Sequence, residues 1–227
     1  QEFGTRVAFK EQGESIHYHA THVGGTLGAA GIMARAEGMA PDVELHSYYW
    51  DYDESEMANA AASYPAENGK LYLSNHSYGT RSGWARYEDG DGNNGWHWPS
   101  DLPWSASAEE ELFGQYNSQA RDWDQIVYDA PYYLPFKSAG NDRNDDPVSG
   151  QTVYRYTGSS WVGVTYNSAS HPAGDGAYKN GFDCIPTYGN AKNIMTVGAV
   201  NDAVSGGSRS VGAASITSFS GWGPADD

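Results

Sequence analysis

Three histidines lie within six residues near the start of the chain. The run HYHATHVGGT covers residues 17–26 and contains His17, His19 and His22. Imidazole is a common general base at neutral pH and the commonest transition-metal ligand in proteins. The run lacks the acidic residue of a His-x-His-x-Asp-His metal site, and no Glu stands between His19 and His22 as a zinc-peptidase motif requires. The run is thus a poor match to these metal sites, and on its own it leaves acid–base chemistry, metal ligation and a purely structural role as hypotheses.

Two later segments combine an apolar run with small and polar residues. LSNHSYG covers residues 73–79, and FKSAGN covers residues 136–141 and ends at Asn141. The carboxamide of such an asparagine is uncharged, and it can donate a hydrogen bond to an oxygen that gains negative charge during a reaction. Taken alone, each segment is better explained by an ordinary strand that ends in a turn.

Short runs of β-branched and aromatic residues alternate with Ala-rich segments along the chain. This alternation is typical of βαβ units and predicts an α/β fold with a mostly parallel sheet flanked by helices. Open sheets of this kind bind ligands at the carboxyl ends of their strands. We expect strands at Val43–Trp50, Lys70–Ser77, Tyr132–Ser138, Asn193–Val200 and Ser215–Ser220.

Three segments have the composition of helices. Thr21–Glu37 is rich in Ala and Gly, and its glycines suggest close packing against a neighbour. Asp53–Ala66 has acidic residues in its first turn, where the helix dipole favours them. Ser105–Asp129 begins with serines and glutamates and ends before Pro131, as a helix does when proline cannot continue it.

Two long connections separate these elements. Thr80–Trp104 is rich in Gly, Asp and Trp, and Asp142–Gly181 is rich in Gly, Ser and Tyr. Within the second, short hairpin strands are expected at Val153–Tyr156 and Trp161–Val164. Connections of this length are commonly functional, or are insertions at the rim of a site.

Composition restricts the partners of the chain. With 13 basic and 29 acidic residues, the 227-residue chain has a formal charge of −16. Such a charge argues against nucleic acid and anionic membranes as partners, and the apolar stretches are too short to span a bilayer. Cys184 is the single cysteine, so an internal disulfide is excluded, and we expect its side chain to be a small buried apolar group.

The motifs together resemble the subtilase family of serine proteases. The histidine run is similar to His-Gly-Thr-His-Val-Ala-Gly-Thr, with Ala20 and Gly24 as small replacements. Residues 73–79 resemble the Asn-x-Ser-x-Gly strand of the substrate cleft, and Ser-Ala-Gly-Asn resembles the oxyanion segment. Residues 191–200 and 217–224 resemble the segments that precede the nucleophile. The order of all these segments is that of the family.

The resemblance implies a role for particular residues. His19 is the expected general base and Asn141 the oxyanion donor of a serine endopeptidase that acts through an acyl-enzyme. His22 is then a structural neighbour. The residues expected to bind substrate are Ser77, Tyr78 and Gly79 along the cleft, with Ala139 and Gly140 at the floor of the specificity pocket.

The resemblance also implies a biological setting. Protein or peptide substrates, a pro-segment and a secreted or cell-surface location are expected. No cofactor is required for the chemistry, although structural calcium is possible, and the run Asn141–Asp146 is its best local candidate.

The rest of the catalytic triad is not recognisable in the sequence. No Asp occurs among the eighteen residues before His19, and no Gly-Thr-Ser-x-Ala segment follows. We expect residues 1–227 to form a partial subtilisin-like domain, incomplete at both ends, with the aspartate strand upstream and the serine helix downstream. This fragment alone is expected to be inactive. A catalytically dead homologue that serves as a binding module remains the alternative.

Overall fold

The computed structural model describes residues 1–11, 15–99 and 104–226. The chain divides into two compact units, Gln1–Ala60 and Ala61–Asp227. No helix in this described part of the chain is both long and apolar enough to cross a bilayer.

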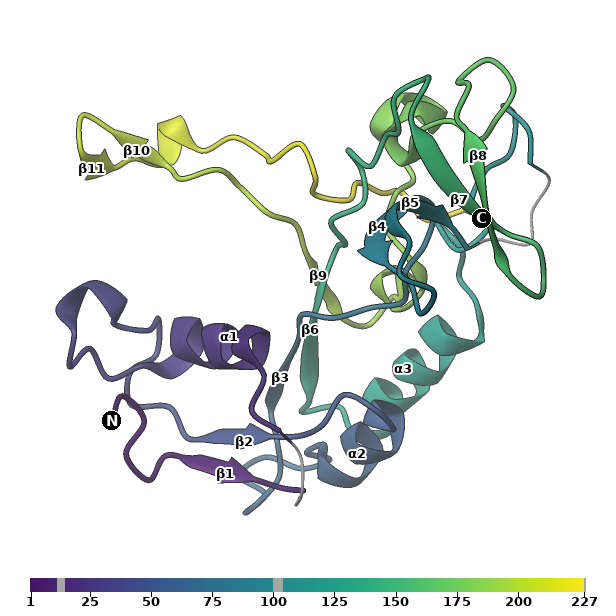
Figure 1. Ribbon diagram of the computed structural model, residues 1–227. Helices are drawn as coiled ribbons and strands as arrows, with labels where there is room; N and C mark the ends of the chain where they lie inside the picture. The colour runs from purple at the N-terminus through teal and green to yellow at the C-terminus, as the bar shows by residue number, and fades with distance from the viewer. Residues whose placement is uncertain (12–14, 100–103, 227) are drawn as a thin grey trace. The chain divides into compact units, whose positions relative to one another are not determined.

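The first unit is built on a pair of parallel strands. β1 (Val7–Phe9) pairs with β2 (Leu45–Ser47), and α1 (Tyr18–Gly28) lies in the connection between them (Figure 1). At the end of α1, a Cβ on Gly28 would lie 2.7 Å from Val43 Cγ1, so only glycine allows this approach to the chain that enters β2. A 3₁₀ turn at Ala34–Ala36 and α2 (Asp53–Ala60) complete the unit.

The second unit contains a parallel sheet in the order β3-β6-β9. Its strands are β3 (Leu73–His76), β6 (Leu134–Ser138) and β9 (Met195–Val197). The helix α3 (Ser118–Asp129) precedes β6. Its fully buried Trp123 meets the ring of His76 edge-on at a centroid distance of 4.7 Å, so α3 covers the face of the sheet on which His76 lies.

A further sheet of the second unit follows the order β4-β5-β7-β8. It combines β4 (Ala85–Glu88), β5 (Asn94–Trp98), β7 (Thr152–Tyr156) and β8 (Trp161–Thr165), with β5 and β7 parallel and the outer pairs antiparallel. The core of this sheet is aromatic and consists of Trp84, Trp98, Val153 and Tyr166.

The remaining elements are short. A hairpin joins β10 (Val204–Ser205) to β11 (Ser208–Arg209). The 3₁₀ turns of this unit are Asp175–Gly181, Thr187–Asn190 and Val211–Ala213.

These elements confirm an α/β fold with mostly parallel strands. Four of the five predicted strands contain an observed one, and both hairpin strands occur as predicted. The strand predicted at Ser215–Ser220 is wrong, since among the described residues this segment makes an isolated bridge from Ile216 to Val200. The connection Thr80–Trp104 is not without structure, because it contains β4 and β5.

The predicted helices were too long. The first spans Tyr18–Gly28 rather than Thr21–Glu37, since the chain after Gly28 turns back through Gly31, whose φ is +74°. The second ends at Ala60, because Ala61 forms a parallel bridge with Leu71.

The third predicted helix, Ser105–Asp129, begins only at Ser118. The side chain of Asn117 caps it, accepting hydrogen bonds from the amides of Gln119 and Ala120. Upstream of this helix, the carboxylate of Glu110 accepts a hydrogen bond from the amide of Gly83, just before β4. This contact holds the segment around Glu110 beside the second sheet, and the segment is not helical.

Candidate functional site

His19 lies in the first turn of α1, in the first unit, and its side chain is exposed. The helix begins after His17, whose Nδ1 accepts a hydrogen bond from the amide of His19 at 3.3 Å. His17 therefore acts as the N-cap, and His22 is exposed on the next turn. The structure thus gives the three histidines different local positions, and it leaves the ring of His19 open to solvent.

The predicted cleft residues Ser77, Tyr78 and Gly79 follow directly after β3. Ser77 and Tyr78 are half-buried and Gly79 is exposed. The side-chain amide of Asn75 donates a hydrogen bond to Ser77 Oγ at 2.9 Å. This segment continues a strand of the parallel sheet beyond its carboxyl end, which is where open α/β sheets bind ligands.

Ala139, Gly140 and Asn141 follow directly after β6, the neighbour of β3. Ala139 is 3% exposed, and its amide donates to Val197 O at 2.9 Å, which joins it to β9. Gly140 has a φ of +90°, a left-handed conformation in which a side chain would be strained. The chain turns there and leaves Asn141 exposed. Because β3 and β6 are adjacent and parallel, the two predicted substrate-binding segments leave the sheet along the same edge.

Each of these two segments follows a strand that carries a buried ionisable residue, His76 in β3 and Lys137 in β6. Neither residue was predicted from the sequence to belong to the site. They are cross-strand partners in the β3–β6 register. Lys137 is 3% exposed and His76 is 7% exposed, which is rare for residues that can carry charge. Burial, and then the charge of Lys137, lower the pKa of His76 to about 4, so its ring is neutral at physiological pH.

Acidic residues follow Asn141 in the chain. Burial raises the pKa of Asp142, although the backbone amides of Asn141 and Asp142 and the charge of Lys137 oppose it. Burial and the neighbouring Asp142 raise the pKa of Asp145 to about 7. Burial raises the pKa of Asp175 well above its ordinary value, although its carboxylate accepts two contacts from the amide of Trp84 at 3.0 Å. After burial, repulsion from Asp142 contributes to the raised pKa of Asp145, and repulsion from Asp142 and Asp145 contributes to that of Asp175.

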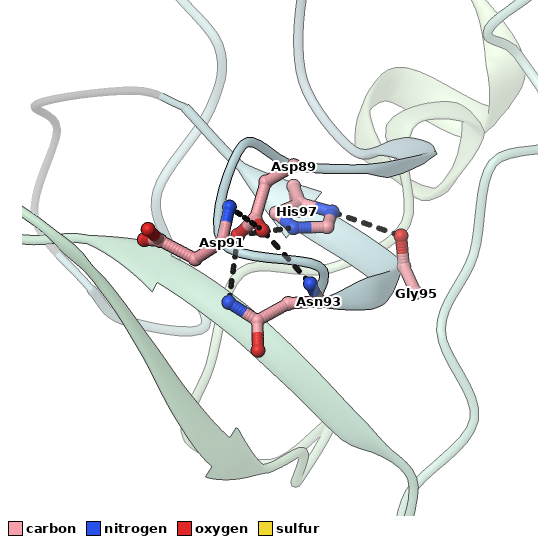
Figure 2. Close-up of polar contacts among 5 residues, drawn as sticks. All are labelled: Asp89, Asp91, Asn93, Gly95 and His97. Atoms are coloured by element: carbon pink, nitrogen blue, oxygen red, sulfur yellow. Dashed lines mark hydrogen bonds and ion pairs between the residues drawn. The ribbon is translucent and has the colours of Figure 1, made fainter.

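Another polar cluster lies in the second sheet, at the turn between β4 and β5 (Figure 2). The ring of His97 is fully buried, with Nε2 3.3 Å from Asp89 Oδ2 and Nδ1 2.9 Å from Gly95 O. Asp89 also accepts hydrogen bonds from the amides of Asp91 and Asn93 and from the Asn93 side chain. These partners of the Asp89 carboxylate come from the β4–β5 turn and from β5, so the cluster stabilises this hairpin.

Cys184 is fully buried, as predicted. Burial first, and then the charges of Asp175 and Asp183, raise the pKa of its thiol to about 12. The thiol is therefore protonated and unsuited to nucleophilic attack or metal binding.

The described residues show no group of three or more His, Cys, Asp or Glu side chains that could hold a metal ion. Within that part of the chain, neither the histidine run nor the acidic segment after Asn141 forms a ready set of metal ligands.

Within the second unit, the site is thus a set of small and polar residues at the carboxyl ends of adjacent parallel strands in an α/β protein. Residues 6–227 match the model of the subtilase family, the S8 peptidases. The chain belongs to the subtilase family, and subtilases are serine peptidases. The comparisons with curated proteins and with solved structures gave no match.

Proposed function

We propose that, in the full-length protein, this domain hydrolyses peptide bonds of protein or peptide substrates through an acyl-enzyme. His19 takes the proton of a serine nucleophile and returns it to the leaving amine, and Asn141 donates a hydrogen bond to the oxyanion. Ser77, Tyr78 and Gly79 bind the extended substrate through their backbone, as in the addition of a strand to a sheet. Ala139 and Gly140 form the floor of the specificity pocket.

One observation carries this proposal. The segments of Tyr78 and Asn141 follow neighbouring strands in parallel register, so a peptide bound along the first segment passes close to the second. A single edge can then hold a substrate backbone and stabilise the charge that develops on its carbonyl oxygen.

The decisive experiment substitutes the proposed base in the full-length enzyme. His19→Ala should lower kcat/KM for a peptide substrate by about 10³-fold or more, because the serine then lacks its base. His22→Ala is the matched control, since it removes an exposed histidine from the same helix, and it should remain within about tenfold of wild type. Comparable losses in both variants, or activity of His19→Ala near that of wild type, would refute the assignment.

The proposal extends to the triad and to the setting. We propose further that neither the serine nor the aspartate of the triad is among residues 1–227, so these residues alone should not react with a fluorophosphonate probe. Labelling of any serine in the fragment would contradict that placement. We also propose that the protein is made with a pro-segment and secreted, and that calcium stabilises it near Asn141–Asp146.

A further inference from the structure

Lys137 occupies the central strand of the parallel sheet. It pairs with His76 of β3 on one side and with Thr196 of β9 on the other. An ammonium group with 3% exposure is costly to bury unless acceptors replace its water. A strand that needed only packing would have an apolar side chain here, so the contacts of Lys137 require an explanation.

The ammonium reaches across to the segment that follows β3. Lys137 Nζ donates a hydrogen bond to the backbone oxygen of Tyr78 and another to Ser138 Oγ at 3.2 Å. It also lies 5.7 Å from the centroid of the Tyr78 ring, within range of a cation–π interaction. A single side chain of β6 thus holds the backbone of one cleft segment and contacts the residue that leads into the other.

His76 fixes the same tyrosine from a second direction. Its Nδ1 lies 2.6 Å from the Tyr78 hydroxyl, and its Nε2 lies 2.7 Å from Ser74 Oγ. Both hydroxyls can donate or accept, so a neutral ring is satisfied at both nitrogens. The carbonyl and the hydroxyl of Tyr78 are therefore both held by buried partners.

We propose that Lys137 is a positioning residue for substrate binding, an inference that rests on the proposed function. Its ammonium holds the carbonyl of Tyr78 and so keeps the segment Ser77–Gly79 in the register at which an extended peptide can pair with it. Lys137 does not touch the substrate. Its effect should therefore fall on the binding of an extended backbone and not on the stabilisation of the oxyanion by Asn141.

The test compares two substrates in the full-length enzyme. Lys137→Met keeps the length of the side chain and removes its charge. Losing a hydrogen bond from a charged group should raise KM for an extended peptide by about tenfold, with kcat within about twofold of wild type. For a small ester of a single amino acid, which makes no contact along the cleft segment, kcat/KM should change less than about twofold.

Thr196→Val is the matched control. Thr196 pairs with Lys137 on the opposite side, and its hydroxyl donates to Gly189 O at 2.7 Å, away from Tyr78. This variant loses a hydrogen bond of the same sheet, so it can lower stability, but it should leave KM for both substrates unchanged.

Unchanged peptide KM in Lys137→Met, or an equal loss for the peptide and the ester, overturns the inference. If that variant does not fold, Lys137→Gln keeps a donor at reduced reach, and the same selective rise in peptide KM is required of it. Failure of the proposed function is recognised separately, by a wild type without peptidase activity or by an Asn141→Leu variant with unaltered kcat.

Discussion

His76 and His97 are both buried in sheets of the second unit, yet their partners differ in kind. His76 faces the hydroxyls of Ser74 and Tyr78, which can donate or accept, and its ring is neutral. His97 faces the carboxylate of Asp89 and the carbonyl of Gly95, and both of these groups only accept. The ring of His97 therefore lies between two acceptors, whereas the ring of His76 lies between two hydroxyls.

The remaining neighbours of His97 and Asp89 complete the cluster. Tyr87 and Tyr154 stack on the ring of His97 at centroid distances of 4.1 and 4.9 Å. Burial favours a raised pKa for Asp89, but hydrogen bonds from Asn93, Asp91 and His97 outweigh it and lower that pKa, which keeps the carboxylate ionised. The β4-β5-β7-β8 sheet thus contains a closed polar cluster around an ionised carboxylate, whereas the β3-β6-β9 sheet places its buried charge, Lys137, against the predicted cleft.

The comparison teaches that buried polar groups have different uses in the two sheets. In the second sheet, Asp89 and His97 interact within one hairpin and stabilise it. In the parallel sheet, Lys137 and His76 hold the segment that we propose binds substrate. Changes to Asp89 or its partners should therefore affect stability alone, whereas changes to Lys137 or His76 can affect stability and should also affect turnover or substrate affinity.

The largest expected effect separates two asparagines that lie just beyond strands. Asn141→Leu should lower kcat by about 10²–10³-fold in the full-length enzyme, with a much smaller change in KM, because an oxyanion donor acts mainly in the transition state. Asn93→Leu, at the β4–β5 turn, removes a hydrogen bond to Asp89 and should leave kcat unchanged. Steady-state kinetics on one peptide measures both. A loss of affinity with full kcat in Asn141→Leu would place Asn141 in a pocket wall instead.

The next effect concerns the pH dependence of stability around His76. The pKa of His76 is about 4 in the folded protein and 6.5 ordinarily, so between these values the unfolded chain binds a proton that the folded chain does not. Stability should therefore fall as the pH is lowered from 6.5 to 4, by about 3 kcal/mol in total.

Urea unfolding of wild type and His76→Gln across this range measures the effect. The difference between the two proteins should change with pH below about 6.5 and be constant between about pH 7.5 and 8.5, where the ring is neutral in both states. A difference that stays constant over the whole range would mean that the ring of His76 is solvated in the folded protein.

The sequence predicted the parallel strands and the order of the motifs, because apolar runs and small residues report on them locally. It could not predict that Lys137 is buried, since a lysine in a strand is expected to reach solvent, and acceptors such as the carbonyl of Tyr78 make its burial tolerable. In the second sheet, β7 and β8 were predicted, but β4, β5 and the joining of the four strands were missed for another reason. Its parallel pair β5–β7 joins two connections that α3 and β6 separate, a long-range pairing that no local pattern reports. The alternating Trp96 and Trp98 were the available signal for a strand there.

Opening the Asp89–His97 contact of the second sheet should have a smaller effect. Asp89→Asn removes the carboxylate that contacts His97 and accepts hydrogen bonds from Asp91 and Asn93, and it should lower the melting temperature by roughly 5 °C without changing kcat or KM. Asp91→Asn is the control, since Asp91 takes part through its backbone amide while its side chain points away from the cluster (Figure 2). Calorimetry of both variants measures their melting temperatures. Equal melting temperatures for Asp89→Asn and wild type would show that the pair contributes nothing.

The smallest expected effect lies in the acidic segment after Asn141, where we propose that calcium and protons compete. The pKa of Asp145 is raised to about 7 in the folded protein from an ordinary value of 3.8, so the folded chain holds a proton that the unfolded chain releases. Stability should therefore decline as the pH rises through this interval, and Asp145→Asn should remove part of that decline. The change should be smaller than that for His76, because Asp145 is only half-buried and solvent screens its charge.

Calcium bound at this segment would favour the ionised carboxylate of Asp145. Adding calcium should therefore flatten the dependence of wild-type stability on pH, and excess chelator should restore the slope. A melting temperature at pH 8 that responds to neither calcium nor chelator would refute calcium binding here, while the slope with pH would still test the environment of Asp145.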